Sequence, residues 1–275
     1  MDVLSQPFNP LRVGERAWLP FPLGAVVPFL FIFTGGAVAA LAGTIPPDIA
    51  RPLATAGFHG GLLAAALASA WGRTEGWLGP AWLLTGLLFL ASLSVWVSPW
   101  GAFAYTFIPL TLWALGRRHP PLRRIGWSWP EDNRAWLLGA GAGLFLGAHL
   151  LLSASRTFGY PIRLTPVGPV LAAIAYDAGA NVLSAELCFR GALFNFWQRR
   201  WGFWAGTILS TAIYLLRYVG DPALPVTLEV IVGLMFYLAL LSVTGCAILA
   251  LSGSLLPSAL AALFFFAAYR TLQLW

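Results

Sequence analysis

Lysine is absent from this 275-residue sequence, and charged residues make up only 9% of it. Soluble domains carry roughly a quarter charged residues, so a composition that is 59% hydrophobic excludes an ordinary soluble protein. The formal charge of +6 arises from 16 arginines and 10 acidic residues. These arginines lie mainly between apolar runs, which indicates topology signals and lipid-headgroup contacts, and we expect no nucleic-acid partner.

Cysteine and histidine are scarce as well. Cys188 and Cys246 lie inside apolar segments, where a thiol behaves as a small buried hydrophobe. Cysteines so placed indicate neither a disulfide framework nor a zinc-type pair. His59 and His149 are single histidines in apolar runs, and each is predicted to be a satisfied core residue. We therefore expect no cofactor.

Long apolar runs occupy most of the chain. They predict an all-α fold, a polytopic transmembrane helical bundle of about eight or nine spans, because about 20 apolar residues cross a bilayer as a helix. The lipid bilayer is then the first expected partner. The third and fourth runs meet at Ser98 and Pro99, so a tight hairpin and one broken pair both stay open. The runs lie near residues 22–43, 52–72, 77–97, 99–116, 135–153, 167–196, 202–219, 225–250 and 254–272.

Arginine placement predicts the orientation. If the spans alternate, most of the arginines in the connections fall on one side of the membrane, which is then the cytoplasmic side. We expect a multi-pass protein of the cell membrane with its N-terminus and the loop at residues 117–134 in the cytoplasm. This loop separates an N-terminal membrane half, residues 1–134, from a C-terminal half, residues 135–275. The end of the loop, Trp127 to Asp132, indicates an interfacial segment that leads into a capped helix.

The apolar segment near residues 167–196 is interrupted by polar residues, among them Asp177, Asn181, Ser184, Glu186 and Arg190. Ionisable side chains at such depth are functional-site candidates by default. Glu186 and Arg190 are four positions apart, so on an α-helix they share a face and can form an ion pair. Asp177 falls on roughly the opposite side, and Asn181 and Ser184 continue that side. The helix thus has two polar stripes, one with Glu186 and Arg190 and one with Asp177, Asn181 and Ser184. The sequence allows two roles for each stripe: a structural contact between helices, or a catalytic or binding role.

Arg217 and Glu229 add charge to the following two spans. Arg217 lies toward the far end of its span and must either snorkel to the interface or find a carboxylate. Asp177 and Glu229 are both candidates for that carboxylate.

The segment from Ala185 to Gly191 resembles the first motif of the CPBP or Abi family, the intramembrane CAAX-type prenyl endopeptidases and their relatives. That motif is Glu-Glu-x-x-x-Arg, often followed by glycine. Other features follow in the same order: an arginine-marked turn at 198–202, a span from Phe203, and the sequence 252–257 before the last motif. The resemblance covers about residues 165–272.

The resemblance implies a helical bundle in which paired glutamates and histidines hold a metal and activate water. Glu186 and Arg190 match the family pattern residue by residue. Four positions depart from it, because a glutamate, two histidines and an asparagine or aspartate are replaced by Ala185, Arg217, Ala262 and Phe266. Apolar side chains cannot ligate a metal, and a fixed cation repels one. We expect that Arg217 replaces the positive charge of the metal and satisfies Asp177 or Glu186.

Three functions are compatible with these residues. The first is a non-catalytic member of the family, a pseudoprotease, that binds a membrane protein, a lipidated peptide or a lipid in the former active-site cleft. The second is an active endopeptidase, with zinc, that recruits Asp177, Asn181, Glu186 and His149 instead. The third is a small transporter subunit with a path along Asp177, Asn181, Arg217 and Glu229, which the lack of an inverted repeat disfavours.

Overall fold

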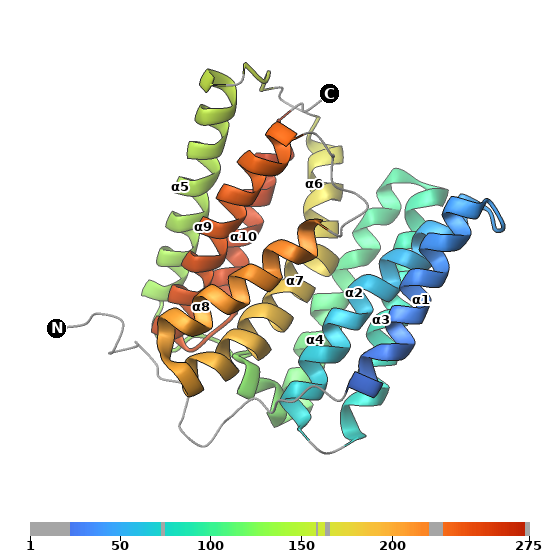
Figure 1. Cartoon of the computed structure of the whole chain (residues 1–275), viewed down its shortest axis with the longest axis horizontal. Coiled ribbons are helices and arrows are strands. Elements are labelled where there is room, and N and C mark those ends of the chain that lie inside the picture. The colour runs from blue at the N-terminus through green and yellow to red at the C-terminus, as the bar shows by residue number, and fades with distance from the viewer. Residues whose placement is uncertain (1–22, 73–74, 158, 163–165, 220–227, 273–275) are drawn as a thin grey trace. The chain divides into compact units, whose positions relative to one another are not determined.

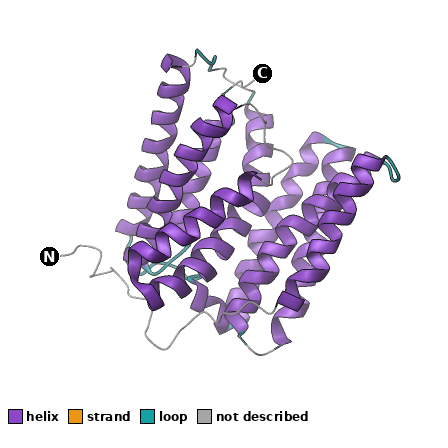
Figure 2. Cartoon of the chain, in the orientation of Figure 1, coloured by secondary structure: helices purple, strands orange, loops and turns teal. Residues whose placement is uncertain are grey.

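The structure, a computed structural model, describes residues 23–72, 75–157, 159–162, 166–219 and 228–272. Helices make up nearly all of this part of the chain, as Figure 2 shows, and it contains no β-strand. An isolated antiparallel bridge joins Ile162 to Leu272. The prediction of an all-α bundle is confirmed.

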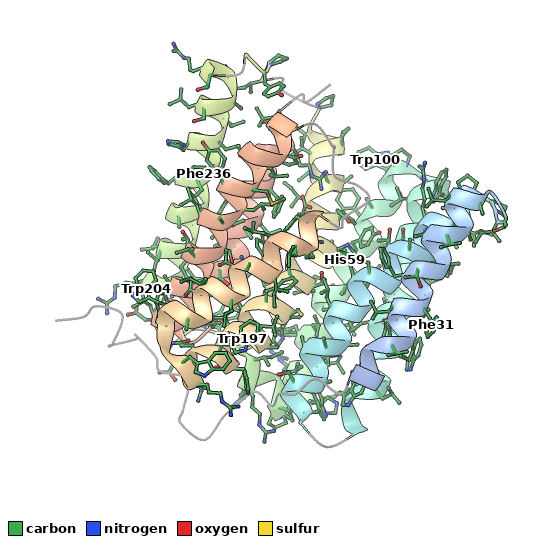
Figure 3. The ribbon with its side chains drawn as sticks, in the orientation of Figure 1. Phe31, His59, Trp100, Trp197, Trp204 and Phe236 are labelled. Atoms are coloured by element: carbon green, nitrogen blue, oxygen red, sulfur yellow. The ribbon has the colours of Figure 1, made fainter. Side chains whose placement is uncertain are left out.

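Five helical segments in the described residues are long and apolar enough to cross a membrane: Pro47–Trp71, Leu78–Val97, Arg134–Thr157, Val167–Tyr218 and Gly233–Ser252. Two shorter apolar helices are Val27–Ala42 and Leu256–Tyr269. Large apolar side chains such as Phe31, Trp204 and Phe236 stand exposed on the helices, as Figure 3 shows. The protein is therefore a multi-pass membrane protein whose apolar helices contact lipid.

The count of eight or nine spans is not confirmed. The run expected at residues 99–116 divides into a 3-10 helix and an α-helix of 12 residues, from Phe107 to Arg118. Such an α-helix is only about 18 Å long, against a hydrocarbon core of about 30 Å. The last run, expected at 254–272, is an α-helix of 14 residues. Among the described residues five helical segments have the length and hydropathy of a full span, and the higher count stays a prediction.

The chain folds into two compact units. Of the described residues, those within 126–162 and 189–272 form unit 1, and those within 23–125 and 166–188 form unit 2. The chain passes from unit 2 to unit 1 after Ile125, within the loop at residues 117–134 where we predicted the boundary between the two membrane halves. The segment Pro166–Cys188 belongs to unit 2, so the region that resembles the CPBP family contributes to both units.

Unit 2 contains a layer of three long helices, α1, α2 and α3, which lie side by side in Figure 1. Small residues bring α1 and α2 together: a Cβ at Gly57 would lie 2.8 Å from the Cα of Phe33. Small residues of this kind allow helices to approach closely in membranes. The elements are α1 (Leu23–Ala42), α2 (Pro47–Trp71), η2 (Glu75–Trp77), α3 (Leu78–Val97), η3 (Pro99–Thr106), α4 (Phe107–Arg118), η4 (Pro120–Ile125), α6 (Val167–Tyr176), η5 (Asp177–Asn181) and α7 (Val182–Ala185).

A tight hairpin connects α3 to the helices after it. Ser98 has an extended backbone, and its hydroxyl accepts a hydrogen bond from the backbone N–H of Trp100. The hydroxyl of Ser94 then donates to the carbonyl of Gly101 at 2.8 Å, so the start of η3 folds back onto the end of α3. Of the two arrangements left open by the sequence, the structure has the hairpin.

Unit 1 contains α5 (Arg134–Thr157), α8 (Asn195–Val219), α9 (Leu228–Ser252) and α10 (Leu256–Tyr269), together with most of η6 (Glu186–Phe194). α5 packs along α10. Gly139 and Gly143 make this close approach possible, because a Cβ at either position would meet the backbone of Pro257 or Ala261. Gly202, with φ 85°, interrupts α8 within the turn predicted at residues 198–202.

Asp132 caps the start of α5. Its carboxylate accepts hydrogen bonds from the backbone N–H of Arg134 at 2.8 Å and from the Arg134 side chain, with an Nη2–Oδ2 distance of 2.7 Å. The side-chain hydrogen bond, the backbone hydrogen bond and the charge of Arg134 hold the pKa of Asp132 below its usual value. The predicted capped helix after the interfacial segment is confirmed.

Candidate functional site

The polar stretch that stood out in the sequence lies in an unusual helix. η5 and η6 are π-helical, and the four-residue α7 separates them. Their i→i+5 hydrogen bonds widen the turn, and π-helical turns are rare and frequent at functional sites. Every residue from Gly179 to Asn195 is buried. The two polar stripes were predicted with the regular α-helical advance of about 100° per residue, which does not hold across these turns.

A buried hydrogen-bond network in unit 2 links α2 to this helix. Ser184 donates its hydroxyl hydrogen to the carbonyl of Ala180 at 2.6 Å. His59 Nδ1, which lies 2.9 Å from Ser184 Oγ, is then the donor to that oxygen. His59 Nε2 accepts the hydroxyl hydrogen of Tyr176 at 3.2 Å. His59, labelled in Figure 3, is thus the satisfied core histidine that the sequence predicted.

The 2.9 Å between Ser184 Oγ and His59 Nδ1 is also the distance expected between a catalytic serine and the histidine that acts as its base. In the structure, however, the serine hydrogen is directed to the Ala180 carbonyl and not to His59. Tyr176 packs edge-on against the rings of His59 and Tyr105. The network therefore ties the helices of unit 2 together through polar groups.

Asp177 and Asn181 lie next to this network in the same helix: Asp177 directly follows Tyr176, and the backbone carbonyl of Asn181 lies 3.5 Å from Ser184 Oγ. Both are buried, and Asn181 Nδ2 donates to Asp177 Oδ1 at 3.0 Å within the same helix. The backbone passes Tyr105 closely here, because a Cβ at Gly179 would meet the Tyr105 carbonyl. Glu186 follows at the start of η6 and is also buried. The ion pair between Glu186 and Arg190 stays a prediction.

A second buried cluster lies within unit 1, which we call the arginine–tyrosine cluster: Arg190, Tyr214, Arg217 and Tyr218. The Arg190 guanidinium stands 4.1 Å from the centre of the Tyr214 ring, and the Arg217 guanidinium stands 4.1 Å from that of Tyr218. The two rings pack edge-on at 5.0 Å, and the Tyr214 hydroxyl donates to that of Tyr218 at 3.4 Å. All four side chains are buried.

Three positions matched to the family motifs converge on this cluster. Arg190 comes from η6, Arg217 from α8 and Phe266 from α10, where Phe266 stacks on the Tyr218 ring at 6.2 Å between centroids. Ala262 lies one turn before Phe266 and is buried, as is Ala185 in unit 2. None of the side chains at the four departing positions offers a metal-binding atom, and the donor set does not fit a zinc site.

The remaining residues that the sequence singled out lie outside the hydrogen-bond network and the arginine–tyrosine cluster. His149 was predicted to be a core residue and this is wrong: it is exposed on α5, and its Nδ1 lies 2.7 Å from the hydroxyl of Tyr237. Glu229 belongs to the first turn of α9, but its side chain is outside the described residues. Cys188 and Cys246 are free and buried as expected. Within the described ranges, no three histidine, cysteine, aspartate or glutamate residues group as metal ligands.

Sequence reasoning missed Tyr214 and Tyr218, which hold the arginine–tyrosine cluster together. Their spacing of four residues on α8, with Arg217 beside the second, was the available signal, because side chains four apart lie on one helix face. Tyr176 was missed as well, since nothing in the sequence relates it to His59.

Comparison with known proteins gives no further assignment. No protein-family model, no curated protein and no solved structure matches the chain.

Proposed function

We propose that this chain is a non-catalytic, CPBP-like membrane protein, a pseudoprotease that binds a membrane partner at the positions of the former active site. The observation that carries the proposal is the convergence of Arg190, Arg217 and Phe266 on two tyrosines whose rings pack edge-on. These residues come from η6, α8 and α10, at positions that we matched to the three motifs of the family in the sequence. The groups that meet there are guanidinium and aromatic groups, which bind anionic or apolar ligands and not a metal.

The expected partner follows from this chemistry. A lipidated peptide or a lipid combines an apolar chain with a carboxylate or phosphate, and a guanidinium recognises both anions through its planar set of N–H donors. Charged side chains at membrane depth are functional candidates by default. The finer topology belongs to the same proposal: eight or nine spans in the cell membrane, with the N-terminus and the loop at 117–134 in the cytoplasm.

Metal analysis tests the non-catalytic assignment. We expect the purified full-length protein to contain far less than one zinc ion per chain. We also expect that it does not cleave a farnesylated peptide in a manner that a chelator abolishes. Stoichiometric zinc together with chelator-sensitive cleavage would establish the active endopeptidase instead.

Binding of the uncleaved farnesylated peptide tests the proposed site. The Arg217→Gln variant should bind the peptide about tenfold more weakly, because hydrogen bonds to charged groups contribute about 1.5 to 3 kcal/mol. Arg270→Gln, a change at the end of α10, serves as the matched control within unit 1. Equal affinities for wild type and Arg217→Gln would remove the arginine–tyrosine cluster from the site.

A further inference from the structure

A basic collar closes one end of unit 2. It consists of Arg117, Arg118, Arg123 and Arg124, from the last turn of α4 and from η4. The first three are exposed, and the segment from Phe107 to Ile125 contains no acidic residue. The four positive charges therefore lie on one short segment without a carboxylate in the segment itself.

The collar is fixed to the end of α2. Arg124 Nη1 donates to the carbonyl of Ala70 at 3.3 Å, next to the last residue of that helix. His119, in the middle of the collar, packs against the Trp71 ring with centroids 5.4 Å apart. These contacts hold the collar at a defined height along α2.

That height matches a membrane interface. At the other end of α2, Arg51 stands over the ring of Trp96, 5.7 Å from its centre. The stretch of α2 from Arg51 to Ala70 is about 28 Å long, close to the hydrocarbon thickness of about 30 Å. Tryptophan concentrates at the two membrane–water interfaces. If α2 crosses the bilayer, the Arg51–Trp96 and Arg117–Trp113 pairs of unit 2 lie about one hydrocarbon thickness apart, at its two faces.

The two ends differ in charge. Arg51 shares the first turns of α2 with Asp48, whereas the collar segment has arginines only. Arg117 stacks on Trp113 with its guanidinium 3.7 Å from the ring centre. Stacking occupies the face of the guanidinium and leaves its N–H donors in the plane, where they fit the oxygens of a phosphate.

We propose that the basic collar binds the phosphate groups of anionic phospholipids in the leaflet that surrounds it. Arg117, Arg118 and Arg123 supply the charge, Trp113 holds Arg117 at headgroup depth, and Arg124 anchors the collar to α2. The proposal concerns unit 2 alone and does not depend on the proposed function.

Native mass spectrometry of the full chain, released from nanodiscs of phosphatidylglycerol and phosphatidylcholine, tests the proposal. The wild type should retain phosphatidylglycerol in preference to phosphatidylcholine. Removing charge at Arg117, Arg118 and Arg123 by substitution with Gln should weaken retention about fivefold for each arginine, the effect of about 1 kcal/mol per basic residue near an anionic surface. The control Arg51→Gln removes an arginine of the same kind at the opposite end and should leave retention unchanged.

Two further measurements distinguish a bound lipid from a bound phosphate ion and test the role of charge. The Arg117→Lys variant keeps the charge and should recover most of the retention lost in Arg117→Gln. Inorganic phosphate, added to the protein in neutral detergent, should not raise the unfolding temperature, whereas phosphatidylglycerol should. Equal losses for the collar and Arg51 variants, no preference for the anionic lipid, or equal stabilisation by inorganic phosphate would each overturn the proposal.

Discussion

Substitution of one glycine on α5 tests the packing of unit 1. A Cβ at Gly143 would lie 2.7 Å from the Cα of Ala261 on α10, whereas ordinary contacts begin at 3.4 Å. Gly143→Ala therefore requires the two backbones to separate by at least about 0.7 Å, since the carbonyl oxygen of Ala261 would lie closer still, and overpacking of this kind costs about 1 to 3 kcal/mol. Gly141, two positions earlier on the same helix, is exposed, and a Cβ there would meet no atom within 4 Å.

The two substitutions should change stability in opposite directions. Alanine is favoured over glycine in a helix by about 1 kcal/mol, so Gly141→Ala should stabilise the protein by up to that amount. The same gain applies to Gly143→Ala, but the overpacking outweighs it, and we expect a net loss of about 1 kcal/mol.

The free energy of unfolding is measured by reversible unfolding of the purified protein in detergent, for example by steric trapping. Gly139→Ala provides a repeat of the experiment one turn away, because its Cβ would lie 2.9 Å from the carbonyl carbon of Pro257. The packing of α5 on α10 is refuted if the Gly143 and Gly141 variants change stability with the same sign and size.

Three further predictions concern polar groups. In a double-mutant cycle, His59→Leu and Ser184→Ala should show a coupling of about 0.6 to 1.7 kcal/mol in the unfolding free energy, as interhelical hydrogen bonds in membranes do, and a coupling of zero would contradict their bond. Tyr214→Leu should destabilise the protein by about 1 kcal/mol more than Tyr214→Phe, because only phenylalanine retains a ring beneath Arg190, and equal stabilities would contradict the contact. The pKa of Asp132 is lowered in the folded state, so its stabilising effect is complete above the usual carboxylate range and disappears as the pH falls through the lowered pKa; an NMR titration that places this pKa at its usual value would contradict the cap.

The long helices could be predicted from the sequence because apolar runs of about 20 residues have one stable form in lipid. The runs expected at 77–97 and 135–153 correspond closely to α3 and α5. The run at 99–116 is not one continuous α-helix, because η3 depends on the turn at Ser98 and on the fold of Gly101 back onto α3. Hydropathy does not register such local contacts.

In the candidate site, too, some features could be predicted from the sequence and others could not. A buried position for Asp177, Glu186 and Arg190 follows from their place in an apolar segment, and the structure has all three buried. The π-helical turns could not be predicted, since the choice between i→i+4 and i→i+5 bonds depends on packing against other helices. The prediction for His149 was wrong because an apolar run does not indicate which face of the helix meets lipid. This residue is on the exposed face of α5.

The absence of lysine, the first feature of the sequence, has a physical counterpart in the structure. Arginine repeatedly packs its guanidinium against an aromatic face, both inside unit 1 and at the two ends of unit 2, in the pairs Arg190–Tyr214, Arg217–Tyr218, Arg117–Trp113 and Arg51–Trp96. A planar, weakly hydrated cation suits these contacts, whereas an ammonium group is compact and strongly hydrated. With 14 tryptophans and 19 phenylalanines, the chain offers many such faces. Arginine thus lets this protein place positive charge in and beside the membrane with an aromatic ring packed against each of these guanidinium groups.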